Sequence, residues 1–172
     1  EAGHPVPDQS GVEASARILE LANSLGPDDQ AICLISGGGS ALLTLPAPGL
    51  SLEDKQSVTA SLLRCGATIH QMNTVRKHLS AIKGGRLAAA CFPASVLTLA
   101  ISDVPRDDPE VIASGPSVPD PSTLADALNV LEHFGINAPQ NVLDHLKKTS
   151  SETPKPGGNS WEKSRYELIA KP

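Results

Sequence analysis

The chain has 172 residues, of which 40% are apolar, and it carries a formal net charge of −5 at pH 7. This length and composition are typical of one compact globular domain and exclude a disordered chain. The charge is spread along the sequence without a run of Lys or Arg. We therefore expect no nucleic-acid or anionic-membrane partner, because both are bound through a basic face, and we expect a small-molecule ligand instead.

Two further features concern location and completeness. The longest apolar runs, such as residues 96–101, are far shorter than the roughly 20 residues that a membrane-spanning helix needs. The three cysteines are far apart and form no C-x-x-C pair, so we expect free thiols in a reducing cytoplasm. Because the sequence begins at Glu1 without Met and stops at Pro172, we expect a piece of a longer protein.

The first predicted helix begins at Ser10, because Glu13 stands three residues later, as in a reciprocal N-terminal cap. The helical pattern ends at Gly26-Pro27, and an unbroken apolar run follows at 31–35. A similar run spans 96–101, and the absence of alternation predicts two strands buried on both faces of a parallel sheet. Ligands of such sheets bind beyond the carboxyl ends of the strands, so we expect the loops after both runs at one functional edge.

The remaining elements are predicted mostly as helices. Two more capped helix starts are expected at Ser51, with Asp54, and at Thr123, with Asp126. The predicted helices of the middle region are 53–65, 69–82 and 86–90, the Pro/Gly-rich stretch 150–160 is a surface connection, and "RYELIAKP" is a candidate final strand. The sequence predicts an α/β fold, a Rossmann-like three-layer α/β/α arrangement with a mostly parallel sheet. Residues 1–156 form a partial domain in this interpretation, and 157–172 form a linker and a candidate strand of the same domain.

Three consecutive glycines in "LISGGGSALLTLP", residues 34–46, follow the first predicted strand. Leu42 stands where both the dinucleotide fingerprint and the P-loop need a glycine, so neither phosphate motif is present. Two interpretations remain, a structural turn or a compact nest of backbone amides that binds an oxyanion, and Pro46 limits any following helix to about one turn. The candidate anion-binding residues are Ser36, Gly37, Gly38, Gly39 and Ser40.

A basic segment, "NTVRKHLSAIKGGRLAA", spans residues 73–89. On a helix, Arg76, Ser80 and Lys83 lie on one face, whereas Lys77 points about 100° away. This face beside a glycine pair is typical either of a binding site for polyphosphate or carboxylate, or of an ordinary solvated helix surface. The candidate residues of the segment are Asn73, Arg76, Lys77, Lys83, Gly84 and Gly85.

An acidic loop, "ISDVPRDDPEVIASGP", covers residues 101–116. Asp103 directly follows the second predicted strand and is the candidate general base or magnesium ligand, with turn capping as the alternative. Ser114 and Gly115 are candidate binding residues in the same loop. The five histidines show no metal-binding spacing, and we assign no role to His133 and His145, which fall in predicted helices. For His4, in an irregular loop between Gly3 and Pro5, a loop hydrogen bond is favoured over catalysis.

Taken in order, the segments "EAGHPVPD", "LISGGGSALL", "LEDKQSVTASLLRCGATIHQMNTVRKHLSAIKGGRLA" and "ISDVPRDDPEVIASGP" resemble the glycerate 2-kinase family. These are two-domain class II glycerate kinases whose C-terminal part is the MOFRL domain. The resemblance implies ATP- and Mg²⁺-dependent transfer of a phosphoryl group to the 2-hydroxyl of D-glycerate, giving 2-phosphoglycerate and ADP. It further implies that this chain is an incomplete N-terminal domain, inactive alone, whose cleft needs the missing C-terminal domain or a second chain.

On this interpretation Asp103 orients the hydroxyl or binds Mg²⁺, and Gly37 to Ser40 bind phosphate or the glycerate carboxylate. Arg76, Lys77 and Lys83 then supply positive charge around the transferred group. Two alternatives stay open. One is an NAD(P)H-dependent hydroxypyruvate reductase, a name that proteins of this family have carried, and the other is a truncated domain without catalytic activity.

Overall fold

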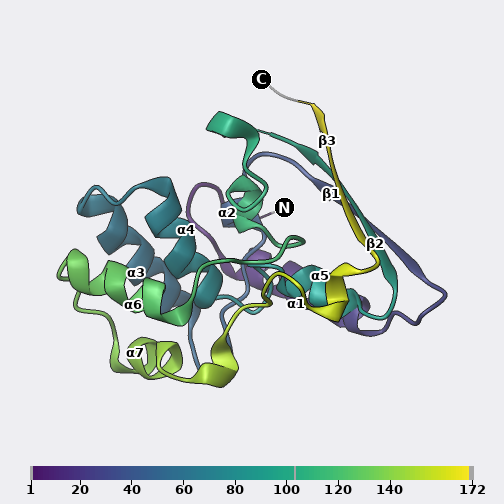
Figure 1. The fold of residues 1–172 in the computed structure, drawn as a ribbon. Helices are drawn as coiled ribbons and strands as arrows, with labels where there is room; N and C mark the ends of the chain where they lie inside the picture. The colour runs from purple at the N-terminus through teal and green to yellow at the C-terminus, as the bar shows by residue number, and fades with distance from the viewer. Residues whose placement is uncertain (1, 103, 171–172) are drawn as a thin grey trace.

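The chain folds around a three-stranded parallel sheet with the strand order β1-β2-β3. A computed structural model describes residues 2–102 and 104–170. Figure 1 shows the sheet beside a group of helices, and the strands are β1 (Gln30–Ile35), β2 (Ser95–Ile101) and β3 (Ser164–Ala170). The α/β class, the parallel sheet and the final strand expected from the sequence are confirmed.

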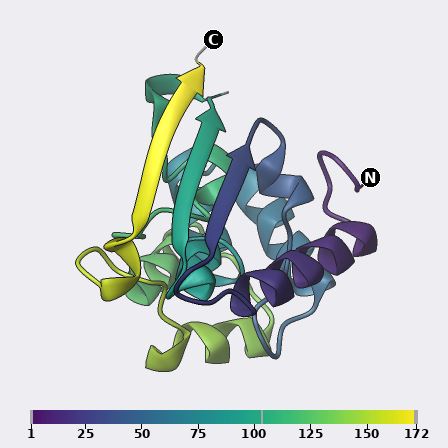
Figure 2. The same ribbon diagram turned by 90° about the vertical axis from the view of Figure 1, so that its right-hand side faces the viewer.

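The two faces of the sheet differ. Val96 and Ala100 of β2 are buried on the inner face. On the outer face Ile32 and Leu34 of β1 are 60% and 74% exposed, and Figure 2 shows no described element in front of the strands. The expectation that residues 31–35 are buried on both sides is therefore wrong, and the described residues form two layers instead of three. An unbroken apolar run indicates that both faces are apolar, but it does not identify what covers them.

The inner face packs against α1 (Gln9–Asn23) and α5 (Arg86–Cys91). Their shared core is a cluster of buried residues: Ala22, Ile82, Leu87, Ala88, Cys91 and Val96. The predicted start of α1 at Ser10 is wrong by two residues. Asp8 is the N-cap, because its Oδ1 accepts from the amide of Gly11 at 2.9 Å, and Asp8 is as good an acceptor as serine.

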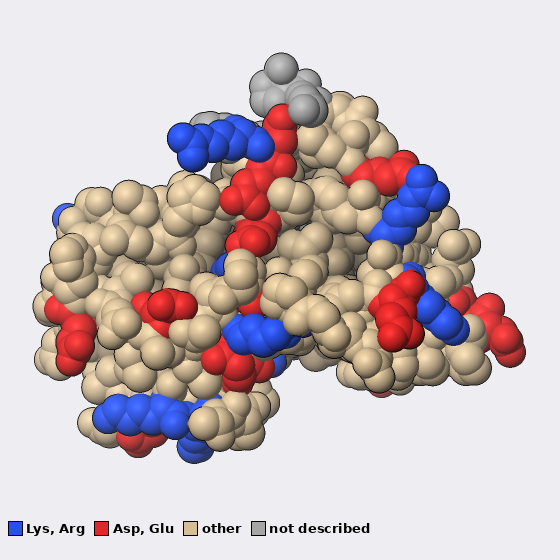
Figure 3. Space-filling model, viewed as in Figure 1, with Lys and Arg blue, Asp and Glu red and all other residues tan. Residues whose placement is uncertain are grey.

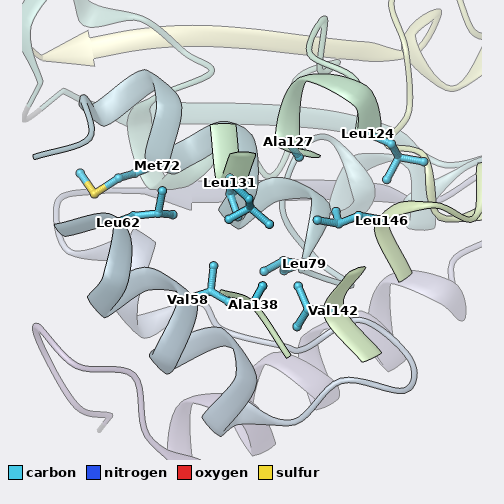
Figure 4. Close-up of a cluster of buried hydrophobic side chains, with 11 residues drawn as sticks. Val58, Leu62, Met72, Leu79, Leu124, Ala127, Leu131, Ala138, Val142 and Leu146 are labelled. Atoms are coloured by element: carbon cyan, nitrogen blue, oxygen red, sulfur yellow. The ribbon is translucent and has the colours of Figure 1, made fainter. Parts of the chain in front are cut away.

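A second group of helices, the helical lobe, consists of α3 (Leu52–Arg64), α4 (Ile69–His78), α6 (Leu124–His133) and α7 (Gln140–Leu146). Figure 4 shows their shared apolar core, to which all four helices contribute. The reciprocal caps predicted at Ser51 and Thr123 are confirmed. The helix predicted over 69–82 ends earlier, at His78, because the Ser80 hydroxyl accepts from the amides of Ile82 and Lys83 and forms a turn there.

Short elements connect these parts at the carboxyl ends of β1 and β2. They are α2 (Gly39–Leu42), η1 (Pro105–Asp107) and η2 (Ile112–Ser114), while η3 (Thr149–Ser151) and η4 (Asn159–Trp161) precede β3. A Cβ added to Gly39 would lie 2.6 Å from the Cβ of Ala113, so the loops after β1 and β2 touch. The expectation of one shared edge is confirmed. Within the described ranges, no helix combines the length and apolar character needed to cross a membrane.

Candidate functional site

The candidate site is a pocket of about 480 Å³ at this edge, between the glycine loop, α3, α4 and the loop that contains η2. Of the residues proposed from the sequence, the structure brings five to its lining: Gly38, Gly39, Ser40, Arg76 and Lys83. Lys55 lines it as well. The irregular N-terminal segment 4–7, which includes His4, lines the pocket too. The pocket therefore combines three cationic side chains with a glycine turn.

Lys83 is the most deeply placed of these cations. Its side chain is fully buried, and its Nζ donates to the carbonyl oxygens of Gly39 at 3.3 Å and Ala113 at 3.2 Å. Burial, followed by the nearby positive charges of Lys55 and Arg76, lowers the pKa of Lys83 well below its ordinary value. Backbone carbonyls orient this ammonium group but do not neutralise its charge.

Lys55 and Arg76 are the other two cations. The Lys55 ammonium donates to the carbonyl of Leu45 at 3.3 Å, and burial together with the charge of Arg76 lowers its pKa to about 7. Burial lowers the pKa of Arg76 as well. Sequence reasoning missed Lys55, although a signal was present. Lys55 falls on the same helical face as Val58 and Leu62, where a core residue is expected.

None of the ion pairs among the described residues involves Lys55, Arg76 or Lys83. Burying a cation without an anionic partner costs several kcal/mol, so proteins rarely do so unless a ligand supplies the charge. Three mutually repelling cations in one pocket make that cost larger. The arrangement fits an anionic ligand that carries more than one negative charge.

The glycine loop forms the opposite wall. Gly38 has a φ of +82°, a left-handed conformation that favours glycine, and it precedes the single turn of α2. The amides of Gly39 and Ser40 are the first of this turn and have no intrahelical acceptor, so they are available to an oxyanion. The expected compact turn of at most one helical turn is confirmed. Ser36 and Gly37 instead line a separate cavity of about 380 Å³ between α1 and β1.

Behind the glycine loop, three consecutive residues adopt left-handed conformations. Their φ values are +51° at Ala113, +63° at Ser114 and +58° at Gly115. The amide of Gly84 donates to the carbonyl of Ser114 at 3.1 Å, and that of Gly85 to the carbonyl of Gly115 at 2.7 Å. These two glycines, proposed as anion ligands, are thus hydrogen-bonded within the protein, and they position the Ala113 carbonyl that accepts from Lys83.

Asn73 and Ser114 do not line the pocket but are connected by hydrogen bonds to Ser40, which does. The Ser114 hydroxyl donates to Asn73 Oδ1 at 3.0 Å and lies 3.1 Å from the Ser40 hydroxyl. Asn73 Nδ2 in turn donates to the carbonyl of Val111 at 3.5 Å. The structure does not place these two side chains in the pocket lining, but it connects them to Ser40, which is there.

Lys77 does not line the pocket. Its ammonium donates to Asp120 Oδ1 at 2.6 Å, and both side chains are buried. Although burial opposes it, hydrogen bonds from Lys77 and Ser122 hold the pKa of Asp120 below its usual range. Lys77 therefore connects α4 to the loop before α6, and its charge is already neutralised.

Asp103, the candidate base and metal ligand, lies outside the described residues. Across the described ranges, 2–102 and 104–170, no group of three or more His, Cys, Asp or Glu side chains forms a candidate metal site. These residues therefore do not by themselves provide a Mg²⁺ site, and we derive no step through a metal ion.

Comparison with known proteins gives relatives that are much longer than this chain. It is 52% identical over 172 residues to a protein of Agrobacterium vitis named "Putative hydroxypyruvate reductase", and it covers 38% of that protein. It is 51% identical over 155 residues, 90% of the chain, to the D-glycerate 2-kinase of Thermotoga maritima, of which it covers 36%. The crystal structure of glycerate kinase from Thermotoga maritima superposes with a TM-score of 0.91 and 48% identity, over 99% of this chain and 39% of the other.

The chain thus spans little more than a third of the length of these relatives. Residues 1–147 match the family described as "Domain of unknown function (DUF4147)". This match covers the glycine loop, all three pocket cations and the left-handed segment 113–115. The chain belongs to the DUF4147 family.

Proposed function

We propose that this chain is the N-terminal part of an ATP-dependent D-glycerate 2-kinase. The observation that carries the proposal is the group of buried Lys55, half-buried Arg76 and buried Lys83, which faces a glycine turn and has no carboxylate partner among the described residues. Phosphoryl transfer requires mainly positioning and neutralisation of negative charge, and cations with backbone amides supply both. The names of two relatives, D-glycerate 2-kinase and glycerate kinase, support the same activity.

In the proposed reaction, the 2-hydroxyl oxygen of D-glycerate attacks the γ-phosphorus of ATP. The bond from that phosphorus to the β–γ bridging oxygen breaks, so that ADP leaves and 2-phosphoglycerate forms. Lys83 and Arg76 lower the energy of the negative charge that develops on the transferred group, and the amides of Gly39 and Ser40 donate to its oxygens. Ser114 and Asn73 act as positioning residues through the hydroxyl of Ser40.

Asp103 completes this proposal as the acceptor of the hydroxyl proton. It is the second residue after the end of β2 in the sequence, in the region where parallel sheets place ligand-binding residues. In this proposal Mg²⁺ would be bound by the phosphates of ATP. Asp103 is the only residue that we propose as a protein ligand of Mg²⁺.

A reductase is the second candidate, because one close relative carries the hydroxypyruvate reductase name. Reduction of hydroxypyruvate needs a nicotinamide cofactor, and the turn that commonly binds its pyrophosphate requires a glycine where this chain has Leu42. Figure 3 shows acidic and basic side chains interspersed, without a continuous basic area on the visible face.

Because the chain spans 36% of the Thermotoga maritima D-glycerate 2-kinase, we propose that its own turnover is negligible and that the remaining domain completes the cleft. A cytoplasmic location is part of this proposal, since Cys33, Cys65 and Cys91 are free thiols.

A chimaera tests the function directly. This chain replaces the matching segment of the Thermotoga maritima enzyme, and ADP release is measured with ATP and D-glycerate. We expect glycerate-dependent ADP release that Lys83→Met lowers by at least about 10²-fold, whereas Lys163→Met, at an exposed residue beside β3, leaves it unchanged. Oxidation of NADH by hydroxypyruvate, without glycerate-dependent ADP release, would instead establish the reductase.

A further inference from the structure

The pocket has two chemically different ends along the pair α3 and α4. On α3, Lys55 and Leu63 are eight residues apart, and on α4, Ile69 and Arg76 are seven apart. At 1.5 Å per residue, each pair is separated by roughly 10–12 Å along its helix. Because only residues 65–68 separate the two helices, Leu63 lies near Ile69 at the connection, and Lys55 and Arg76 lie together at the far end. One end is therefore cationic and the other apolar.

The apolar end is open to solvent. Val6, Leu63 and Ile69 line the pocket, yet they remain 62%, 58% and 40% exposed. Large apolar side chains gathered at the mouth of one cavity indicate a surface that a ligand covers. The wall is fixed rather than loose, because Gln56 Nε2 donates to the carbonyl of Pro7 at 2.7 Å and ties segment 4–7 to α3.

The pocket is larger than D-glycerate alone requires. A volume of about 480 Å³ falls in the range of sites for drug-sized ligands, whereas glycerate has only seven non-hydrogen atoms. The pocket fits a longer molecule with several negative charges at one end and a flat, largely apolar group roughly 10 Å away. Small side chains at Thr59 and Ala60 leave width for such a group between the two ends.

We infer that this pocket is the nucleotide subsite, with the phosphates of ATP at Lys55, Arg76 and Lys83 and the adenine ring between segment 4–7 and the α3–α4 connection. The inference rests on the proposed function for the identity of the nucleotide. It goes further by assigning the ring to Leu63 and Ile69, and by making Lys55 a phosphate-binding residue. In this arrangement D-glycerate would approach the phosphates from the side of the loop that follows β2.

Calorimetric titration of the 172-residue chain with ATP, inorganic tripolyphosphate and D-glycerate, all without Mg²⁺, tests this placement. Burial of the ring should make ATP bind at least about tenfold more tightly than tripolyphosphate. Ala60→Leu fills the middle of the pocket and should abolish this difference while leaving the tripolyphosphate affinity unchanged. Ala125→Leu, at an exposed position of α6 outside the pocket, should leave both affinities as they are.

A second variant guards against misfolding of Ala60→Leu. Leu63→Ser alters an exposed side chain and should weaken ATP binding about three- to fivefold, again without an effect on tripolyphosphate. Equal affinities of ATP and tripolyphosphate, or failure of ATP to bind, would overturn the inference. The inference would also be overturned if Leu63→Ser weakened the affinities for ATP and for tripolyphosphate by the same factor. The chimaera's glycerate-dependent ADP release is measured separately, so the nucleotide placement can fail while the proposed function stands.

Discussion

The ammonium of Lys77 lies 2.6 Å from Oδ1 of Asp120, and both groups are buried. Lys83, six residues later, is equally buried, but among the described residues its ammonium donates only to the carbonyl oxygens of Gly39 and Ala113. One lysine is thus paired with a carboxylate inside the fold, whereas the other lines a pocket without a carboxylate partner among the described residues. The two should respond in opposite directions to the same substitution.

Lys77→Met should destabilise the chain by about 3–5 kcal/mol, because it leaves the Asp120 carboxylate buried without its partner. Lys83→Met removes a buried amino group that has no carboxylate partner in the described part of the chain, so stability should stay unchanged or rise by about 1–4 kcal/mol, while tripolyphosphate binding is lost. Urea unfolding at pH 7 gives both free energies. A Lys83→Met variant that unfolds as readily as Lys77→Met would show that Lys83 is a structural residue and not an anion ligand.

Gly39→Ala should destabilise the chain by about 1–3 kcal/mol, because the new Cβ would lie 2.6 Å from that of Ala113. Ala113→Gly removes the opposing atom and relieves a φ of +51°, so the double variant should recover most of the loss. Gly26→Ala is the matched control, since its nearest neighbour in such a variant is an ordinary 3.6 Å away. Additive losses in the double variant would contradict the contact between the two loops.

The acid limit of stability should depend on Glu152. Burial opposes ionisation, but hydrogen bonds from Lys155 and from the amides of Leu124 and Thr153 lower the pKa of Glu152 to about 2. A carboxyl with a lowered pKa stabilises the fold above its unfolded value near 4.5 and loses that contribution as the pH falls toward 2. Glu152→Gln should therefore cost about 1–3 kcal/mol at pH 7 and progressively less between pH 4.5 and 2.

Thermal unfolding at half-unit pH steps measures this dependence for the parent, for Glu152→Gln and for Glu162→Gln, an exposed control. The control should follow the parent at every pH. A constant difference between Glu152→Gln and the parent down to pH 2 would contradict the assigned role of the Glu152 carboxylate.

Asp103→Asn in the chimaera should lower glycerate-dependent turnover by at least about 10²-fold, because an amide cannot accept the hydroxyl proton. The Michaelis constant for ATP should change by less than about threefold if Asp103 acts on glycerate alone. Turnover within about threefold of the parent would remove Asp103 from the catalytic group. Asp28→Asn, at an exposed residue before β1, serves as the control.

The outer face of the sheet should make the isolated chain self-associate. Ile32 and Leu34 pair with Leu97 and Leu99 of β2 across that face, and β1 is an edge strand among the described residues. Leu34→Lys adds a charge there and should lower the association without reducing the melting temperature, since Leu34 is already largely exposed. Sedimentation velocity at several concentrations measures this, and unchanged association in Leu34→Lys would contradict it.

Local signals in the sequence were sufficient for much of the fold. The caps at Ser51 and Thr123 depend on residues three positions apart, and the two apolar runs correctly predicted β1 and β2. One error arose where two residues, Asp8 and Ser10, were both able to cap the same helix. Another arose after His78, where hydrogen bonds to the Ser80 hydroxyl form a turn and end the helix. The exposure of the outer face of β1 could not be predicted for a different reason. Apolar residues indicate that a face is suited to burial, but they do not identify which segment covers that face.

The site was predicted less completely than the fold. Lys77 lies apart from Arg76 and Lys83, as predicted, although α4 ends before Lys83 and the helical spacing used for that prediction does not extend to it. That spacing could not identify Asp120, 43 residues away, as the partner of Lys77. Lys55 joins the pocket from another helix, so no linear pattern connects it to Lys83. The roles of the pocket residues and of Asp103 remain predictions that the experiments above test.

The hydrogen bonds from Gly84 and Gly85 to the left-handed residues at 114 and 115 bear on how fast a ligand can bind. These bonds hold segment 113–115 in place before any anion arrives. Entry of the anion therefore requires no rearrangement of the backbone at 113–115. Association should then be governed by diffusion into the mouth of the pocket and by attraction to its cations, and it should slow as the ionic strength rises. The preformed turn would thus remove a conformational step from ligand binding.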